Sequence, residues 1–552
     1  MLDSLKTTTF ARALIVCTFA FVLASCGSES DVSSTGSAGS VVALNQGAAW
    51  NPSNQAAFYT TDQGSRIMPY EWAKALKLPN GESFLSQLTT AYGYIPSPVS
   101  PSNPEGLPVG FLVANPGTKD QQLSITCAAC HTRQIQVGEI KHRIDGGPAF
   151  ANLYALFQGI DLVVGNTLSN ADAFNAFQAA VQVPAETLRT QLSAWYTPYN
   201  TLMSRALPST PWGIGRADAV GMIQNRLSGL DLGPLANSHI IASNIAVAAQ
   251  PVRYPFIWNS GKQDLTQWAG TNINGNSPYA LERNAGEAIG VFGIFYPQAN
   301  AAVSGGVDFL SQNSIKYSNL QNIQDLVNQI GPPQWPWPVD NGLVFQGKAL
   351  YEKNCTSCHG VKQGQPRPGN PNTWATPVQN VQTDSSYYNN FRVITTSSGV
   401  LTGFKVPFQG TIIPASGAVS INLVTAGNVG ALVQQNPAID LSIRPPSNPT
   451  GSYESKVLQG VWAAAPYLHN GSVPTLAALL TPAAARPKSF QVGPVYDIVN
   501  VGLSVEQPNG SATVRVTTDC ATMAGESRCG HEFGTLLTQD EKTALIEYLK
   551  TL

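Results

Sequence analysis

Charged residues are scarce in this chain. They account for 12% of 552 residues, and 31 Lys and Arg nearly balance 33 Asp and Glu, for a formal charge of −2. The chain has no basic excess with which to neutralise phosphates, which excludes nucleic-acid binding as its function. Histidine and methionine are also rare, with six and five copies. Few side chains are therefore available to complete a metal site.

The apolar run at residues 13–24 is too short to cross a bilayer but has the length of a signal-peptide core. It ends in Leu-Ala-Ser-Cys, which resembles the lipobox of bacterial lipoproteins. We therefore expect residues 1–25 to be a lipoprotein signal peptide, Cys26 a lipid anchor in the membrane, and 26–45 a flexible tether. An ordinary cleaved signal with Cys26 incidental is the alternative. Both interpretations predict a periplasmic or cell-exterior protein, and Gly27 in place of an Asp favours the outer membrane.

The eight cysteines indicate the chemistry. Four of them lie in two copies of the haem-attachment pattern C-x-x-C-H: Cys127, Cys130, His131 and Cys355, Cys358, His359. Two thiols on one helical turn can reach both vinyl groups on one porphyrin edge, and the next His then reaches the iron. The pattern predicts two covalently bound c-type haems and disfavours a zinc site or a redox dithiol. Cys520 and Cys529 remain, and export predicts a disulfide between them.

The length of the chain and the spacing of the motifs predict two haem domains. A chain of this length is too long for one ordinary core. Residues 332–338, Pro-Pro-Gln-Trp-Pro-Trp-Pro, cannot form a continuous helix or an inner strand. We interpret them as a linker between an N-terminal haem c domain at 46–331 and a C-terminal cytochrome c domain at 339–552. The expected fold class is mainly α, with long loops and short β insertions in the C-terminal domain.

Helical signals are strongest at the two ends of the C-terminal domain. Apolar residues at helical spacing in 343–351 lead into Cys355, as in the N-terminal helix of small c-type cytochromes. Thr538 and Glu541 form a capping box ahead of an apolar stripe. We expect these two helices to pack together around the second haem.

Elsewhere the patterns are weaker. Residues 172–181 and 185–195 are predicted to be helices, and most of the remaining N-terminal half to be loops. Residues 391–427 and 491–517 are rich in Val, Ile, Thr and Gly, and are predicted to form short strands or long loops.

The second axial position decides whether a c-type haem transfers electrons or reacts, because a haem with His or Met on both faces is closed to oxygen and peroxide. For the second haem, His531 is the first choice, since it follows the expected disulfide and precedes the terminal helix. Met523 and His469 are alternatives, and His531 could instead lie on the surface. His469 is as readily a buried contact of the haem edge or propionates as a ligand.

For the first haem, no second ligand stands out. His142 follows His131 too closely to reach the opposite face easily, and its basic neighbours favour a solvated strand or propionate contacts. His239 lies among helix-compatible apolar residues and is interpreted as a core histidine. An open first haem is therefore expected.

Some aromatic and basic residues carry two interpretations. Trp335 and Trp337 could form an electron path between the haem domains or simply pack. Arg253, Arg283 and Lys456 could pair with haem propionates or lie on the surface.

Longer motifs carry a family resemblance. Residues 466–476, Pro-Tyr-Leu-His-Asn-Gly-Ser-Val-Pro-Thr-Leu, together with the two C-x-x-C-H motifs, resemble the bacterial di-haem cytochrome c peroxidase superfamily. Five further segments are similar to its rubber oxygenase branch: 144–148, 254–258, 283–287, 460–466 and 530–535.

The resemblance implies a role for each haem. His131 would hold the reactive, oxygen-binding iron, and His359 and His531 would close the other iron. Phe256 and Trp258 fall where the branch has aromatic pocket residues, so we take them with His131 as candidate catalytic residues.

Some positions depart from the family pattern. Peroxidase relatives carry a Met or Tyr ligand where this chain has Ala483, which cannot ligate. Ile257, Lys456 and Val457 replace the aromatic, Arg and Pro residues expected from the resemblance.

The sequence thus predicts an exported, lipid-anchored di-haem oxidoreductase that activates O2 or peroxide at the N-terminal haem and transfers electrons through the C-terminal one. Its partner would be a small redox protein or an apolar substrate. A peroxide-reducing cytochrome c peroxidase and a non-enzymatic electron carrier are the alternatives.

Overall fold

The computed structural model describes residues 40–552 except for 235–238, 275–277, 368–369 and 509–512. The predicted signal peptide at 1–25, the proposed anchor at Cys26 and most of the tether lie outside the described residues. Within the described ranges, no helix combines the length and the apolar character needed to span a bilayer.

Helices and short strands alternate along the described part of the chain. The α-helices are α1 (Pro52–Thr60), α2 (Tyr70–Ala75), α3 (Phe84–Thr90), α4 (Leu153–Ser169), α5 (Ala171–Val181), α6 (Ala185–Ala206), α7 (Ala219–Arg226), α8 (Tyr279–Gly290), α9 (Tyr317–Val327), α10 (Asn341–Asn354), α11 (Thr356–His359), α12 (Ser386–Val393), α13 (Ser420–Gln435), α14 (Leu476–Leu479) and α15 (Gln539–Lys550). The strands are β1 (Val41–Ala43), β2 (Met68–Pro69), β3 (Phe111–Ala114), β4 (Gln122–Ile125), β5 (Thr132–Val137), β6 (Ile140–Asp145), β7 (Arg216–Ala217), β8 (Val252–Arg253), β9 (Leu265–Thr266), β10 (Asn272–Ile273), β11 (Gln298–Ala299), β12 (Val307–Asp308), β13 (Val378–Gln379), β14 (Thr395–Thr396), β15 (Ala418–Val419), β16 (Tyr453–Glu454), β17 (Ser489–Val492), β18 (Tyr496–Asp497), β19 (Gly502–Leu503) and β20 (Thr513–Val516).

The fold is mixed α and β, so the prediction of a mainly α protein is wrong. Strands occur in both halves of the chain and pair in small sheets of two or three strands. Many are only two residues long, too short for the alternation of apolar and polar residues that marks a strand in sequence. The predicted short strands of 491–517 are confirmed by β18, β19 and β20.

Two three-stranded sheets flank the first C-x-x-C-H motif. In one, β4 pairs antiparallel with both β2 and β3; in the other, β6 pairs antiparallel with β5 and parallel with β1. The motif begins just after β4 and ends just before β5, so the two sheets fix the entry and the exit of the turn that carries it.

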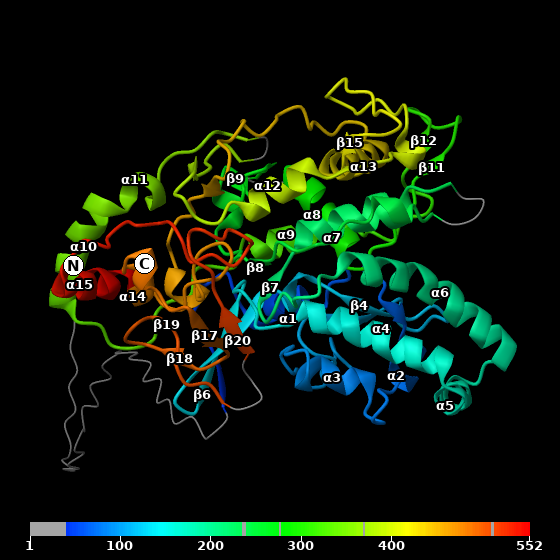
Figure 1. The fold of residues 1–552 in the computed structure, drawn as a ribbon, viewed down its shortest axis with the longest axis horizontal. Helices are drawn as coiled ribbons and strands as arrows, with labels where there is room; N and C mark the ends of the chain where they lie inside the picture. Colours follow the sequence, from blue (N-terminus) through cyan, green and yellow to red (C-terminus); the bar gives the residue numbers. More distant parts are fainter. Residues whose placement is uncertain (1–39, 235–238, 275–277, 368–369, 509–512) are drawn as a thin grey trace, which may run out of the picture.

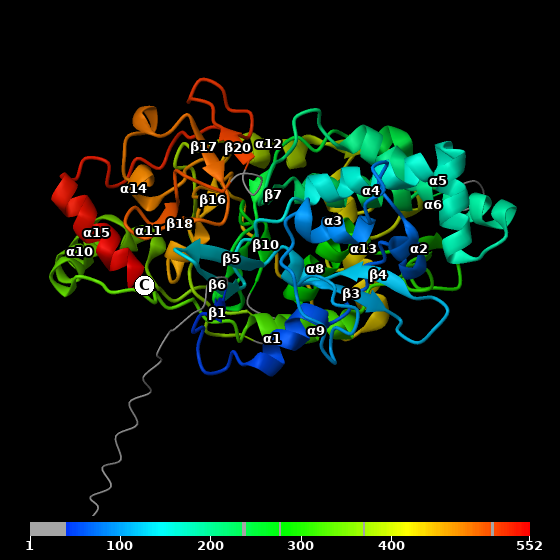
Figure 2. The ribbon, with the colours of Figure 1, turned by 90° about the horizontal axis from the view of Figure 1, so that it is seen from below.

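Helices dominate both ends of the molecule. Helices α4, α5 and α6 lie at one end of the long axis, and α10 and α15 lie at the other (Figures 1 and 2). Helices α5 and α6 confirm the predictions for 172–181 and 185–195. The expectation of mostly loops in the rest of the N-terminal half is wrong, because α1, α4, α8 and α9 also lie there.

The short strands or loops predicted for 391–427 are confirmed by β14 and β15, but the end of the range is helical, because α13 begins at Ser420. Its sequence has low helix propensity, but its burial against α7 and α8 compensates. Gly430 permits a further contact of α13, with Phe309, because a Cβ atom there would lie 2.5 Å from the Phe309 ring.

Helices α10 and α15 pack together, as predicted. The capping box of Thr538 and Glu541 is formed at the start of α15. The closest approach is at Gly347, where a Cβ atom would lie 1.9 Å from the carbonyl oxygen of Ala544. Only glycine allows the two backbones to approach so closely.

The hydrophobic core crosses the predicted linker at 332–338. One cluster of buried residues joins Phe58 and Ile144 from the N-terminal half to Val461 and Leu545 from the C-terminal half. The division into domains at this linker stays a prediction.

Candidate functional site

The second C-x-x-C-H motif opens onto a cavity of about 190 Å³. Helix α10 leads into Cys355, and α11 carries the rest of the motif. The cavity is lined by both motif cysteines, three histidines and apolar side chains, which include Cys355, Cys358, His359, His469, His531, Phe256, Leu476, Leu479 and Leu545. Met523 is not among the lining residues, so the cavity brings together the motif and two of its three candidate second ligands.

His359 is anchored from outside the motif. Its Nδ1 lies 2.7 Å from the carbonyl oxygen of Lys456 and donates to it when it carries the proton. This hydrogen bond fixes the ring and leaves Nε2 as the free lone pair, which is the arrangement that metal-bound histidines adopt. Burial lowers the pKa of His359, so the ring is neutral and able to ligate.

His531 faces His359 across the cavity. The centres of the two imidazole rings are 6.1 Å apart. A metal bonded to one nitrogen of each ring at about 2.0 Å, with about 1.1 Å from nitrogen to ring centre, requires a separation of about 6.2 Å. Burial, and next the neighbouring His359, lower the pKa of His531 to about 3, which keeps it neutral. The pair therefore fits an iron held between two histidines.

His469 forms part of the cavity wall. Its ring stacks on Tyr453 with the ring centres 3.7 Å apart, and Trp268 lies edge-on at 6.5 Å. Burial lowers its pKa to about 3. A neutral His469 held between aromatic rings is suited to contact the edge of a cofactor.

Basic side chains also line this cavity. Arg253 donates through Nε to the carbonyl of Leu468 at 2.9 Å, but its buried Nη1 has no hydrogen-bond partner. Lys456 pairs with Glu454 at 2.7 Å. An unsatisfied guanidinium nitrogen in the wall fits an acidic group such as a haem propionate. Arg283 is not among the residues of this wall and instead binds Asn274 and Asn284.

The first motif is held in a turn between strands. Cys127–Ala129 form a single 3-10 turn that follows β4, and β5 begins at Thr132. The Nδ1 of His131 lies 3.0 Å from the carbonyl oxygen of Pro255. Burial lowers the pKa of His131 to about 4. The first histidine is therefore anchored and neutral in the same way as the second.

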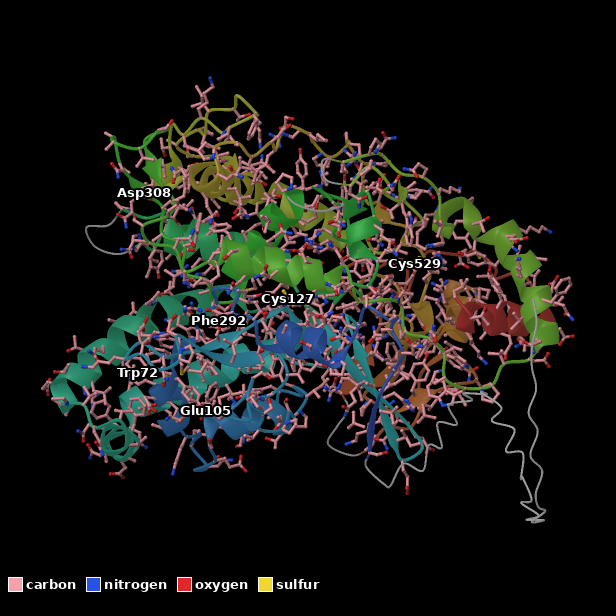
Figure 3. The ribbon with its side chains drawn as sticks, turned by 180° about the vertical axis from the view of Figure 1, so that it is seen from behind. Trp72, Glu105, Cys127, Phe292, Asp308 and Cys529 are labelled. Carbon is pink, nitrogen blue, oxygen red and sulfur yellow. A yellow bond between two sulfur atoms is a disulfide. The ribbon has the colours of Figure 1, made fainter. Side chains whose placement is uncertain are left out.

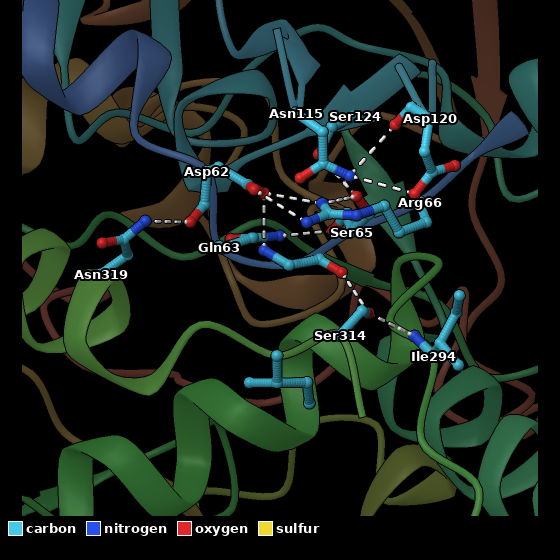
Figure 4. A network of polar contacts seen from close by, with 12 residues as sticks. Asp62, Gln63, Ser65, Arg66, Asn115, Asp120, Ser124, Ile294, Ser314 and Asn319 are labelled. Carbon is cyan, nitrogen blue, oxygen red and sulfur yellow. Dashed lines mark hydrogen bonds and ion pairs between the residues drawn. The ribbon is translucent and has the colours of Figure 1, made fainter. Parts of the chain in front are cut away.

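Gln63 contacts the first motif and was not predicted. The thiol of Cys127 donates to Gln63 Oε1 at 3.3 Å, and the Gln63 amide donates to Ser65 Oγ at 3.0 Å. The surrounding loop is fixed by bonds from Ser124 and Ser314 and by the Arg66–Asp62 ion pair (Figure 4). Nothing in the sequence near Gln63 signals a partner that lies 64 residues away.

The surroundings of the thiols favour uncharged sulfur. Burial raises the pKa of Cys127 and Cys130 to about 12 and that of Cys355 to about 11. Zinc ligands and reactive dithiols need thiolates, whose pKa is lowered. A haem thioether is an uncharged sulfur, so these sites fit thioether attachment better than either alternative.

The two motif histidines have different ring neighbours. The ring contact of His131 is with Tyr254, with the ring centres 6.4 Å apart. His142 packs edge-on against Trp337 at 5.1 Å, and His239 stacks on Tyr296 at 4.2 Å, so other rings engage both. His142 lies on strand β6 as predicted but is buried, which corrects the expectation that it is solvated.

The segment at 254–258 lies against both sites. Pro255 anchors His131, while Phe256 lines the second cavity and stacks on the fully buried Trp258 at 4.7 Å. The indole of Trp258 donates to the carbonyl of Gln459 at 2.8 Å. Catalysis by Phe256 and Trp258 stays a prediction; their observed position is between the two motifs.

The tryptophans of the predicted linker form an aromatic cluster. Trp335 contacts Trp337 at 4.7 Å and Trp462 at 5.1 Å, and Trp337 stacks on Tyr496 at 6.4 Å. The Trp462 indole donates to the carbonyl of Pro333 at 3.0 Å. These contacts establish packing; an electron path through them stays a prediction.

The expected disulfide between Cys520 and Cys529 is present. It lies immediately before the loop that carries His531. Figure 3 labels Cys127 near the middle of the molecule and Cys529 closer to the end that carries α10 and α15.

Comparisons with known proteins agree with this geometry. Residues 452–491 match a family described as RoxA-like, cytochrome c-like, and residues 344–405 match the cytochrome c family. The uncharacterized protein y4iJ of Sinorhizobium fredii is 28% identical over 578 aligned positions, covering 91% of this chain and 92% of that protein. The uncharacterized protein y4iM of the same organism is 26% identical over 285 positions, covering 50% of this chain and 55% of that protein. The C-terminal part of the chain thus has cytochrome c-like sequence of the RoxA-like kind, for which covalently bound haem is the expected cofactor.

Proposed function

We propose that the protein is a di-haem c-type cytochrome oxidoreductase that activates O2 or peroxide at the N-terminal haem and transfers electrons through the C-terminal haem. One observation carries the proposal. Both motif histidines are anchored through Nδ1 to a backbone carbonyl, yet only His359 is faced by a second histidine, at 6.1 Å between ring centres. The asymmetry supports one closed and one reactive site.

At the C-terminal site, the chain would hold the haem through Cys355 and Cys358 and close both axial positions with His359 and His531. Arg253 Nη1 would donate to a propionate. A site with two histidine ligands undergoes little rearrangement when an electron arrives, so this half of the molecule is suited to electron transfer.

At the N-terminal site, Cys127 and Cys130 would attach the haem and His131 would hold its iron. When bound, this haem supplies a redox-active iron with an exchangeable axial position. The protein's part is to keep His131 neutral and fixed through Pro255, and to surround the site with buried side chains such as Tyr254.

The finer assignment is between a dioxygenase acting on an apolar substrate and a peroxidase taking electrons from a small redox protein. The RoxA-like match at 452–491 favours the oxygenase. Ala483 occupies the position at which peroxidase relatives carry a ligand, and this also favours the oxygenase. A non-enzymatic carrier would instead need both haems closed.

One spectroscopic experiment tests the proposal. EPR and absorption spectra of the resting protein should contain one low-spin haem with two histidine ligands and one haem that is high-spin or binds an exogenous ligand. Addition of peroxide to the resting protein, or of O2 after chemical reduction, should perturb the N-terminal signal alone. Two low-spin haems that ignore both oxidants would support the electron carrier, and a colourless protein would refute the proposal.

We also propose that the protein is exported and lipid-anchored through Cys26 in the outer membrane, facing the periplasm or the exterior. The lipobox-like sequence at the end of 13–24 supports this. Metabolic labelling with a fatty-acid analogue should mark the wild type and not Cys26→Ala. Equal labelling of both would contradict it.

A further inference from the structure

A buried guanidinium ties the loop that carries His531 to the wall of the second cavity. Arg486 is 2% exposed and uses all five of its N–H groups as donors to backbone carbonyls. The acceptors are Arg528 and Gly530 at 2.7 Å, His531 at 3.1 Å, Thr481 at 3.2 Å and Leu479 at 3.3 Å. Three acceptors lie in the His531 loop and two lie in 479–481, where Leu479 lines the cavity.

His531 depends on such external support. Its φ of 52° lies in the left-handed region, which is unfavourable for a residue with a side chain. The Nδ1 of His531 has no hydrogen-bond partner, whereas the Nδ1 of His359 is bonded to Lys456. The His531 ring is therefore positioned by its backbone and by the edge-on packing of Phe533, with ring centres 5.3 Å apart, and not by a hydrogen bond at Nδ1.

The other side of this loop is also fixed. The amide of His531 donates to the carbonyl of Val381 at 2.9 Å. Gly530, with φ of 75°, lies so close to Gln382 that a Cβ atom would come within 2.3 Å of its carbonyl carbon. The Cys520–Cys529 disulfide restrains the start of the loop. On the remaining side, Arg486 donates hydrogen bonds to the loop carbonyls.

We propose that Arg486 is the positioning residue that holds His531 as the second axial ligand of the C-terminal haem; this role rests on the proposed function. The planar guanidinium bonds to two chain segments at once, since its donors point in fixed and divergent directions. Lysine would place three donors on one nitrogen and could not bridge both segments in the same way. Arg486 thus substitutes for the missing ring hydrogen bond of His531.

The test uses Arg486→Lys and Arg486→Gln in the full, haem-loaded protein. Protons compete with the iron for His531, so a loosely held ligand is displaced at higher pH. If His531 binds the iron tenfold more weakly, the pH midpoint of the low-spin to high-spin transition rises by about 1 unit. We expect a rise of about this size for Lys and a larger one for Gln, measured by absorption and EPR at the C-terminal haem.

Arg515→Lys is the matched control. Arg515 is also buried and donates to backbone carbonyls, of Gly471 at 2.9 Å and Ile214 at 2.7 Å, but its acceptors lie outside 528–531. The pH midpoint of the low-spin to high-spin transition in Arg515→Lys should equal that of the wild type.

A double variant separates positioning from a general structural role. In a His531→Ala background, Arg486→Lys should leave the spectrum and the reduction potential of the C-terminal haem unchanged, because the ligand to be positioned is gone. An unchanged midpoint in both single variants, or an equal perturbation in the His531→Ala background, would overturn the proposal. So would failure of both Arg486 variants to mature with haem while Arg515→Lys matures normally. The proposed function fails separately, if the wild type carries fewer than two haems or if His531→Ala alone changes nothing.

Discussion

The two C-x-x-C-H motifs lie in different kinds of backbone but share one device. The first occupies a 3-10 turn between β4 and β5, and the second follows helix α10. In both, the histidine Nδ1 is bonded to a carbonyl from a distant segment. The sites differ in the rings beside the histidine, because His359 is faced by His531 whereas His131 contacts the ring of Tyr254. In each site the motif and one carbonyl fix the motif histidine, and residues from distant segments make up the rest of its surroundings.

Removal of the attachment cysteines is expected to have the largest effect on this comparison. Cys127→Ala with Cys130→Ala should abolish haem at the N-terminal site, and Cys355→Ala with Cys358→Ala at the C-terminal site, because covalent attachment holds each ring. Intact mass and haem staining should each report one macrocycle fewer than in the wild type. Retention of two macrocycles by either double variant would contradict the assignment of that motif.

The next largest effect is expected from His531→Ala, which should make the two sites alike. The reduced wild type should bind carbon monoxide at the N-terminal haem only, since under the proposed function His359 and His531 would close the other iron. The variant should bind it at both, doubling the stoichiometry in an optical titration. His142→Ala, outside both sites, should leave the stoichiometry at one. A wild type that already binds two would show that His531 is not a ligand.

Acidification should weaken both sites. In the haem-free chain, burial lowers the pKa of His131 to about 4 and, with the neighbouring His359, that of His531 to about 3, against an ordinary value of 6.5. Below pH 6.5 the unfolded chain takes up protons that the folded protein refuses, so stability is greatest above 6.5 and falls as pH decreases toward the folded-state pKa. The free energy of unfolding should fall by about 1.4 kcal/mol per pH unit for each histidine.

Urea unfolding at pH 7, 6 and 5 measures this slope. His131→Gln and His531→Gln should each reduce the slope by the contribution of one histidine. If either variant retains the full slope, the burial of that histidine does not contribute to acid sensitivity.

Alanine substitutions at two glycines are expected to give the smallest difference between the two sites. A Cβ atom at Gly110 would lie 2.1 Å from the amide of Ala129 in the first motif, and one at Gly347 would lie 1.9 Å from the carbonyl of Ala544 between α10 and α15. Each Ala substitution should cost about 1 to 3 kcal/mol of stability. Gly110→Ala should perturb mainly the N-terminal haem and Gly347→Ala mainly the C-terminal one, as seen by absorption during thermal unfolding.

Gly117→Ala is the control for Gly110→Ala. Both glycines have positive φ, but a Cβ atom at Gly117 has no neighbour within 4 Å. Its cost should be limited to about 1 kcal/mol of backbone strain. Equal losses at Gly110 and Gly117 would mean that contact with the motif turn is unimportant.

Local signals in the sequence were sufficient for part of this molecule. The capping box of Thr538 and Glu541, helices α5 and α6, and the disulfide each depend on neighbouring residues or on simple pairing. Helix α13 is not predicted, because its Val, Thr and Gly residues disfavour a helix in isolation and burial against α7 and α8 stabilises it.

Local sequence patterns reveal only some of the residues in the candidate sites. The cysteines and motif histidines are readable because their chemistry fixes their spacing. Arg486 and Gln63 are not, since their partners are backbone carbonyls or side chains many residues away and leave no local pattern. His142 misleads for a related reason: its basic neighbours face outward while alternation along β6 turns the imidazole inward onto Trp337.

The segment at 254–258 contributes to the surroundings of both C-x-x-C-H motifs. The carbonyl of Pro255 bonds to the imidazole of His131, and the neighbouring Phe256 lines the cavity that contains His359 and His531. Phe256 stacks on the fully buried Trp258, and close packing leaves this segment little free space in which to shift. A substitution within 254–258 should therefore alter the surroundings of both C-x-x-C-H motifs.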